Sequence, residues 1–156
     1  MKDPYVEARF QEIDTAIQRS KLSSADDVYL QSCLASYLVV LISGYYEDTV
    51  EHLVGVRAGK AGDPDLQNLV KELVSYSFKT PNWESIKRLI GLFNNESYKK
   101  VLDKKVDDKA RAAISSIVTN RHSIAHGKPI AVTLGDVESF HNSSKPVFEA
   151  LEDILI

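Results

Sequence analysis

The chain has 156 residues, 44% of them hydrophobic, which is enough for one packed core and predicts a single domain over residues 1–156. Its formal net charge of -3 excludes a protein that coats nucleic acid nonspecifically, because such binding comes from neutralising many phosphates with Lys and Arg. If the protein acts on RNA, its positive potential must therefore be local.

The cysteine content and the hydropathy of the chain indicate in which cellular compartment the protein is expected. The one cysteine, Cys33, has no partner for an intramolecular disulfide and is interpreted as a small core residue. The first residues, Met1 to Gln11, lack the basic start and apolar run of a secretory signal. The longest apolar stretch, Cys33 to Tyr46, is shorter than a membrane span. We therefore expect a soluble cytoplasmic protein that does not associate with a membrane.

The first third of the chain is predicted to be two helices. Ser24, followed by Asp27 three residues later, has the pattern of a capping box, which predicts that a second helix begins at Ser24. The segment 55–64 holds three glycines and a proline and is predicted to be a loop. Apolar residues at helical spacing define the inner face of the opening helix (Val6, Phe10, Ile13, Ile17) and of the second, central helix (Leu30, Leu34, Leu38, Leu41, Ile42, Tyr45, Leu53).

Three shorter helices are predicted next. Asp63 as N-cap and Pro64 at the first helical position begin a third helix, and Thr80-Pro81-Asn82 ends one helix and caps the next. The segment 95–109 is dominated by Lys and Glu, so we expect a short exposed helix and a turn there. The apolar residues expected to point inward are Leu66, Leu69, Val70, Leu73 and Val74 in the third helix and Trp83, Ile86, Leu89, Ile90 and Phe93 in the fourth.

Two longer helices complete the prediction. Asp107 or Asp108 caps the first, which ends at Gly127 followed by Pro129. Thr133 and Asp136 form a capping box for the last helix, and Pro146 is expected to kink or split it. The predicted buried residues are Ala110, Ala113, Ile114, Ile117 and Val118 in the first of these helices and Val137, Phe140, Val147, Leu151 and Ile154 in the second. No segment alternates like a strand, so the fold class is all-α, a bundle of four main helices with shorter connecting ones.

The segment from Asn120 to Gly127 places one arginine and two histidines in the last two turns of a helix. Arginine keeps its proton, whereas histidine titrates near neutrality. Cleavage of RNA without a metal requires a base that takes the proton of the 2′-hydroxyl and a cation that stabilises the charge on the phosphorane. Imidazole and guanidinium meet these needs. The motif therefore predicts a ribonuclease that uses no metal or cofactor and leaves a 2′,3′-cyclic phosphate.

The spacing within the motif matters for this chemistry. Arg121 and His126 are five residues apart and diverge by ~140° on an ideal helix, whereas His122 and His126 share a face. The helix ends at Gly127, which relaxes the geometry, and two motif helices packed about a twofold axis would bring an Arg and a His to one cleft. The helix dipole favours the imidazolium form of His126, which suits a proton donor as well as a transient base, and the two roles stay open.

The motif also resembles a known family. Arg121, four intervening residues, His126 and the downstream Gly127 resemble the signature of HEPN-domain ribonucleases. The segments 38–53 (LVVLISGYYEDTVEHL), 82–94 (NWESIKRLIGLFN) and 132–155 look like helices of the RiboL-PSP-HEPN branch. The resemblance implies a helical-bundle homodimer that acts as a metal-independent endoribonuclease, often in toxin–antitoxin or phage-defence settings. Its partners would be RNA and an antitoxin or a defence-system protein.

The resemblance also assigns roles to residues. Arg121 and His126 match the catalytic pair, and His122 occupies a polar place where many members have Asn, so its role as an orienting or a titrating group stays open. Glu47 resembles an acidic residue that could hold the arginine in position. Asn120 is expected to support the geometry and Lys128 to contact RNA.

Simpler interpretations compete with these roles. Cationic residues at a helix end can simply complement the dipole, and Glu47 can belong to a solvated face. His122 and His126 have the spacing of two zinc ligands, with a third from His52, His141 or a carboxylate. Tyr45 and Tyr46 can stack on bases, although core packing with one hydroxyl bonded is favoured. At the level of function, the alternative is a non-catalytic HEPN-like module that binds RNA or a protein.

Overall fold

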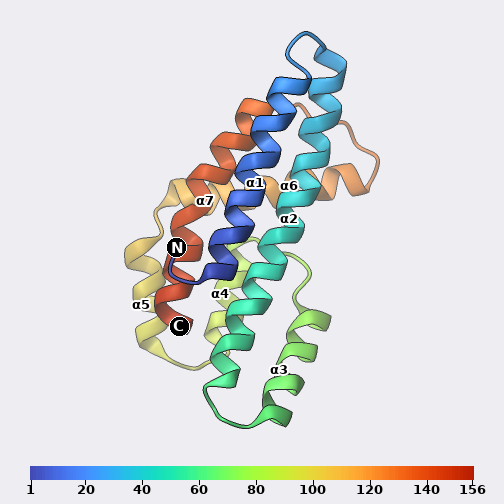
Figure 1. Cartoon of the computed structure of the whole chain (residues 1–156). Helices are drawn as coiled ribbons and strands as arrows, with labels where there is room; N and C mark the ends of the chain where they lie inside the picture. The colour runs from blue at the N-terminus through green and yellow to red at the C-terminus, as the bar shows by residue number, and fades with distance from the viewer.

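The computed structural model describes all 156 residues and contains seven helices and no strand. The all-α fold class is therefore confirmed. Four helices are long and three are short, as predicted (Figure 1). Their bounds are α1 Pro4–Ser23, α2 Val28–Gly59, α3 Pro64–Ser77, α4 Trp83–Gly91, α5 Glu96–Lys105, α6 Asp108–Ala125 and α7 Leu134–Leu155.

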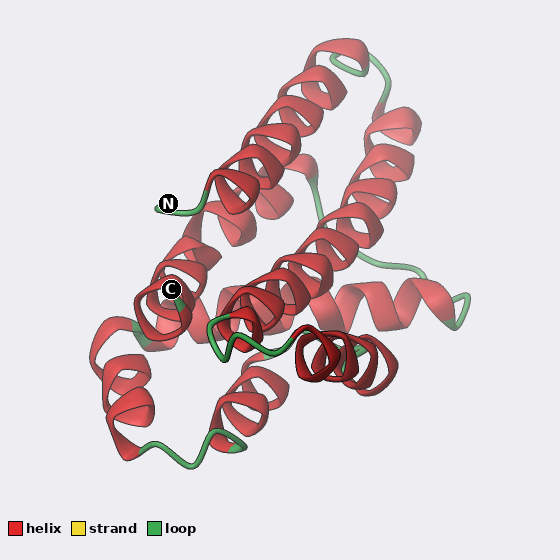
Figure 2. Ribbon diagram, turned by 60° about the horizontal axis from the view of Figure 1, so that its bottom comes forward, coloured by secondary structure: helices red, strands yellow, loops and turns green.

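Helix α2 is the centre of the bundle. It contacts α1, α3, α6 and α7, and α6 and α7 also pack against each other. α6 crosses the long helices, and its C-terminal end extends past α2 (Figures 1 and 2). The largest fully buried side chains include Tyr46 in the middle of α2 and Phe148 in α7, whose rings are 4.7 Å apart. The core thus lies where the four long helices meet.

The boundaries of α2 differ from the prediction at both ends. Asp27, not Ser24, caps the helix by accepting a hydrogen bond from the Leu30 amide at 2.9 Å. The Ser24 hydroxyl is buried and donates to the carbonyl of Ser20 at 2.7 Å, so it belongs to the end of α1. At its other end, α2 continues as helix to Gly59, and the predicted loop is reduced to residues 60–63.

Gly55 lies within α2, at a point where a neighbouring helix approaches closely. A Cβ atom at this position would lie 2.9 Å from the Cε atom of Lys71 in α3. The side chain of Gln67, one turn before Lys71, donates to the Gly55 carbonyl at 3.1 Å. The missing side chain of Gly55 therefore allows α2 and α3 to pack closely. The predicted loop was wrong here because it treated the glycine as a helix breaker.

The prediction for α3 is correct at its start but wrong about the burial of its apolar face. Asp63 caps the helix and Pro64 is its first residue. Among the five residues expected to point inward, Val74 alone is buried and Val70 is half-buried. The three leucines are 43% to 57% exposed, because α3 packs mainly against α2 and nothing else in the chain covers its outer side: Leu66, Leu69 and Leu73.

The remaining helices follow the prediction closely. Asn82 caps α4, Asp107 caps α6, and Thr133 and Asp136 form the predicted capping box of α7. Pro146 lies inside one continuous helix, so α7 is not split. Phe93 and Phe140 are half-buried instead of buried. The other predicted core residues of these helices are buried: Trp83, Ile86, Leu89, Ile90, Ala110, Ala113, Ile114, Ile117, Val118, Val137, Val147, Leu151 and Ile154.

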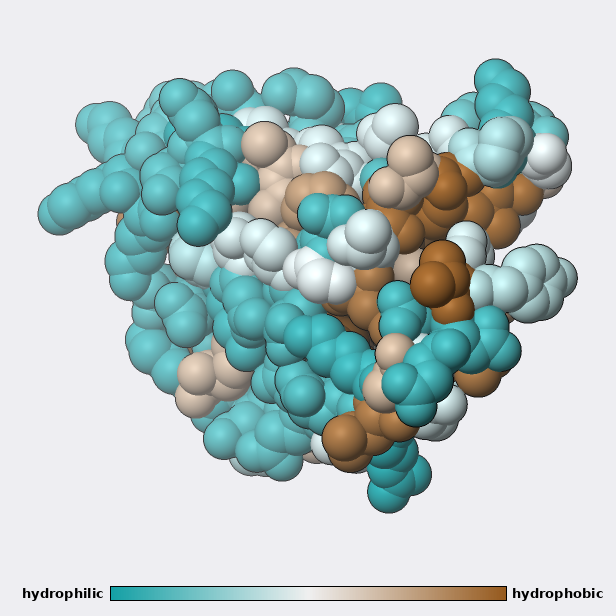
Figure 3. All heavy atoms as spheres, turned by 90° about the horizontal axis from the view of Figure 1, so that it is seen from above, coloured by the Kyte–Doolittle hydropathy of each residue, from teal (hydrophilic) through white to brown (hydrophobic).

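The N-terminal half of α2 exposes an apolar stripe, which corrects the prediction for Cys33. Cys33 is exposed and lies on one face of α2 with Tyr29, Tyr37 and Val40, which are 80%, 58% and 45% exposed. α3 contacts α2 only further along, so the stripe has no cover from the chain. Figure 3 looks onto this end of the molecule and shows apolar residues gathered on one side, with polar residues over most of the rest.

On length and composition alone, α2 is long and apolar enough to cross a membrane, which the shorter stretch considered in the sequence is not. The central helix of a water-soluble bundle meets the same criteria. α2 contacts four other helices and carries the charged residues Glu47, Asp48 and Glu51 in its C-terminal half.

Candidate active site

The last turn of α6 has a well-defined end. Gly127 adopts a positive φ of 67°, and its amide donates to the carbonyl of Ile124 at 2.9 Å. The amide of Lys128 donates to the carbonyl of Ser123, also at 2.9 Å. These two bonds form a Schellman motif, which satisfies carbonyls that a helix end otherwise leaves open. The motif fixes His126 at the C-cap, at the boundary between helix and loop.

Replacing Gly127 with alanine is expected to destabilise the protein by about 1–2 kcal/mol, because a Cβ atom is unfavourable in the left-handed region. Nothing else lies within 4 Å of the position of that Cβ, so the cost comes from the backbone alone. Urea unfolding of Gly127→Ala measures it. Gly127→Asn is the matched control, since Asn tolerates this conformation, and equal losses in both variants would contradict the assignment.

The two motif histidines lie together on the surface. The ring centroids of His122 and His126 are 4.3 Å apart, and the rings meet edge to face. Both residues are exposed. Their separation of four residues places them on one side of the helix, as the spacing predicted.

Arg121 lies at the same helix end but is not joined to the histidines. It is half-buried, and its guanidinium makes no hydrogen bond or salt bridge within the chain. No interaction links it to His126. A single chain therefore brings the two imidazoles together and leaves the guanidinium without a partner.

The surroundings differ among Asn120 and Glu47, which are expected to support the site, and Lys128, which is expected to contact RNA. Asn120 donates from Nδ2 to the carbonyl of Ser116 at 2.8 Å, inside its own helix. Glu47 lies 3.4 Å from the ammonium of Lys79, so within one chain its ion pair is with lysine, not with Arg121. Lys128 is exposed directly after the helix end.

The other two histidines of the chain do not join the pair. His52 lies in α2 with its Nε2 3.1 Å from Asp3 Oδ1, and its ring stacks on Tyr5 at 4.3 Å. His141 lies inside the core, 3.2 Å from Asp14. Neither one supplies the third ligand that a zinc site at His122 and His126 would require. No group of three or more His, Cys, Asp or Glu side chains in the structure is arranged to hold a metal ion.

His141 belongs to a buried polar network. The Tyr46 hydroxyl lies 3.0 Å from His141 Nδ1 and 2.5 Å from the Ser144 hydroxyl, which donates to the His141 carbonyl at 2.8 Å. Burial raises the pKa of Tyr46. Burial also lowers the pKa of His141 from 6.5 to about 4, although the carboxylate of Asp14 acts in the opposite direction.

Sequence reasoning located half of this network. It favoured core packing with one bonded hydroxyl for the pair Tyr45 and Tyr46, and the structure confirms this for Tyr46, whereas Tyr45 is half-buried. It treated His141 only as a candidate zinc ligand. His141 lies four residues after Val137 and three before Ser144, on the buried face of α7, and this spacing was the signal that could have placed it in the core.

The principal cavities of the chain lie elsewhere. They are lined by residues of α1, α2, α3 and α4 with the turns beside them, and none of them includes Arg121, His122 or His126. His122 and His126 are exposed at the end of α6, outside these cavities.

Comparisons with known proteins agree with the resemblance seen in the sequence. The family model RiboL-PSP-HEPN matches residues 6–156, essentially the whole chain. No curated protein and no solved structure matches it. HEPN domains are generally ribonucleases or RNA-binding modules. By its sequence match and its all-helical fold, the chain belongs to the RiboL-PSP-HEPN family.

Proposed function

We propose that the protein is a metal-independent endoribonuclease that works as a homodimer. A base takes the proton of the 2′-hydroxyl, the 2′-oxygen attacks the neighbouring phosphorus, and the 5′-oxygen leaves with a proton. The products end in a 2′,3′-cyclic phosphate and a 5′-hydroxyl. Arg121 binds and stabilises the phosphate, and His126 transfers a proton.

This proposal rests on the exposure and contacts of three side chains at the end of α6. The rings of His122 and His126 are in contact and exposed, and Arg121 has no partner within the chain. A guanidinium that is not neutralised is available to a phosphate.

A second copy of the chain would complete the site. Arg121 and His126 share no hydrogen bond or ion pair in one chain, and neither lines a principal cavity. Two copies that meet near the ends of their α6 helices would place an Arg and a His on opposite sides of one cleft. The apolar stripe of Tyr29, Cys33, Tyr37 and Val40 offers a surface for such a contact, because α6 extends past α2 on this half of the molecule.

Glu47, Asn120 and Lys128 have secondary roles in this proposal. Lys128 is exposed beside the motif and contributes to phosphate binding. Asn120 keeps the last turns of α6 in place through its bond to the Ser116 carbonyl. Glu47 would reach Arg121 only after leaving Lys79, or across the dimer. Toxin or phage-defence activity is the biological setting that we propose for this chemistry, with an antitoxin or defence-system protein as partner.

Cleavage of single-stranded RNA in the presence of EDTA tests the proposed chemistry. We expect the purified protein to produce fragments with 2′,3′-cyclic phosphate ends, because neither Arg121 nor His126 requires a metal. Mass spectrometry of the fragments identifies the ends. Fragments with 5′-phosphate ends, or cleavage that disappears in EDTA, would contradict the proposal. Protein that binds RNA and never cuts it would support the alternative, a non-catalytic module.

A further inference from the structure

Helix α3 is the least covered helix of the molecule. One of its 14 residues, Val74, is buried, while Leu69, Leu73 and Tyr76 are 56%, 57% and 86% exposed. A helix of this length is marginally stable in water unless its apolar face packs against something. Contiguous exposed apolar surface of this kind marks an interaction site more often than a free surface.

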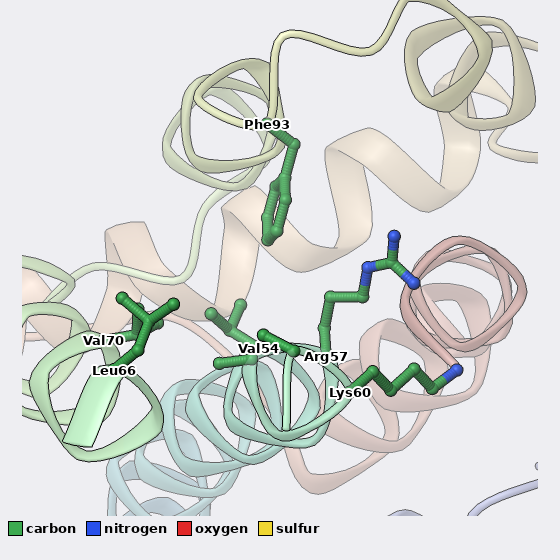
Figure 4. Close-up of a pocket in the computed structure, with 8 residues that line it drawn as sticks. Val54, Arg57, Lys60, Leu66, Val70 and Phe93 are labelled. Carbon is green, nitrogen blue, oxygen red and sulfur yellow. The ribbon is translucent and has the colours of Figure 1, made fainter. Parts of the chain in front are cut away.

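A groove runs beside these leucines. Two cavities of about 330 Å³ and 230 Å³ share Val54, Val70 and Phe93, so they form one continuous depression. α2 provides the floor, α3 one wall, and the end of α4 the other. Figure 4 shows Phe93 reaching from the end of α4 toward Val54, with Leu66 and Val70 on the opposite side.

The groove is already formed in the free chain. Gln67 ties α3 to the Gly55 carbonyl at 3.1 Å, and Asp63 caps the start of α3 by accepting from the amide of Leu66 at 3.1 Å. The side chain of Lys71 also packs close to Gly55, since a Cβ atom there would lie 2.9 Å from its Cε atom. A ligand therefore need not separate α3 from α2.

Cationic side chains lie at both ends of the groove. Arg57 and Lys60 line the first cavity (Figure 4), and Arg88 lines a small neighbouring cavity that shares Ser77 with the second one. Arg57 and Arg88 have no salt-bridge partner in the chain, and the ammonium of Lys60 bonds only the Ile156 carbonyl. The groove is thus apolar in its middle and positive at its ends.

We propose that this groove binds an amphipathic helix of a partner protein, with an apolar stripe in its middle and acidic residues near its ends. Leu66, Val70, Leu73 and Ser77 line one wall over three turns of α3, a length of roughly 16 Å that matches three turns of a bound helix. Acidic ends complement the unpaired arginines.

The rim of the groove favours a helix over a small amphiphile such as a fatty acid. Leu92 is 78% exposed on one rim, and Leu69 and Leu73 are more than half exposed on or beside the other. One acyl chain would fill the floor and leave these leucines in water. A helix with side chains is about 10 Å wide and covers both rims. This binding surface is separate from Arg121 and His126, so the inference does not depend on RNA cleavage.

Synthetic peptides test this inference directly. The probe is a fluorescein-labelled helical peptide of about 14 residues with leucines at spacings of four, three and four residues and glutamates at its ends. Its counterpart carries lysines in place of the glutamates. We expect fluorescence anisotropy to show micromolar binding of the acidic peptide and at least about tenfold weaker binding of the lysine peptide. No binding of the acidic peptide up to about 0.1 mM would overturn the proposal.

Variants locate the binding. Leu73→Lys is expected to reduce the affinity at least about tenfold, and Arg57→Glu to reverse the preference between the two peptides. Leu22→Lys, at a leucine that is 81% exposed in α1, is the matched control and should bind like the original. Equal loss in Leu22→Lys and Leu73→Lys would refute the groove as the site. A change from dimer to monomer in Leu73→Lys, measured by sedimentation, would identify a second copy as the occupant and overturn the proposal.

Discussion

Replacing His126 with alanine is expected to slow RNA cleavage by about 10²–10⁴-fold, the range that proton transfer by a positioned side chain contributes. His126 is exposed at the C-cap of α6, and its backbone makes the helix-ending contacts, so the fold should survive the change. Initial rates on single-stranded RNA in EDTA measure the effect, with circular dichroism and the Tm as checks on the fold. Full activity in His126→Ala would end the catalytic assignment.

Mixing two inactive variants tests whether the site is shared between subunits. Arg121→Ala and His126→Ala each remove one group from every copy. In mixed dimers, a shared arrangement leaves one cleft with both groups intact, so co-refolding the two variants should restore about a quarter of the original activity. If Arg121 and His126 instead act within one chain, mixing restores nothing.

The second large effect concerns stability at acidic pH. Because His141 is buried and its pKa is lowered from 6.5 to about 4, the unfolded chain takes up a proton before the folded one does. The free energy of unfolding therefore has its full value above pH 6.5 and decreases as the pH falls from 6.5 to 4. This shift corresponds to about 3 kcal/mol. Urea unfolding at several pH values in this window measures the loss.

The surroundings of His141 explain why its pKa is lowered and not raised. The carboxylate of Asp14 lies 3.2 Å from Nε2, but this nitrogen makes no hydrogen bond, and Lys145 lies 3.3 Å from the same carboxyl group and weakens its effect. Burial therefore dominates. His141→Gln should remove most of the pH dependence between 4 and 6.5, and His122→Gln, at an exposed position, should keep it. An unchanged slope in His141→Gln would refute this origin.

The parts of the fold that depend on local chemistry could be predicted. Helix α6 is an example, since Asp107 caps it, Gly127 ends it, and the apolar positions between them are buried as their spacing indicated. Local signals were insufficient where two residues competed for one role. Ser24 and Asp27 are both good N-caps, and only the burial of the Ser24 hydroxyl against Ser20 decided between them.

Where the prediction failed, contacts between distant segments were decisive. The pattern of α3 identified its apolar side correctly, but no local pattern shows whether another helix covers that side, and Leu69 and Leu73 are exposed. The same holds for Gly55, because glycine occurs both in loops and at close helix contacts, and the local sequence does not distinguish the two. At the candidate site, the spacing of His122 and His126 predicted their contact, and the five-residue separation of Arg121 and His126 agrees with the absence of any interaction between them.

Pro146 interrupts the hydrogen-bond ladder of α7 at one point. A proline has no amide hydrogen, so the carbonyl of Asn142, four residues earlier, lacks its helical partner, and Asn142 is exposed to water. The half before the proline adjoins the loop that follows His126, and the half after it contains Glu152, which accepts hydrogen bonds from the amides of Lys2 and Asp3. Slow opening motions at this break can therefore reach the part of the bundle where α6 ends without loosening the end where the two termini are tied together.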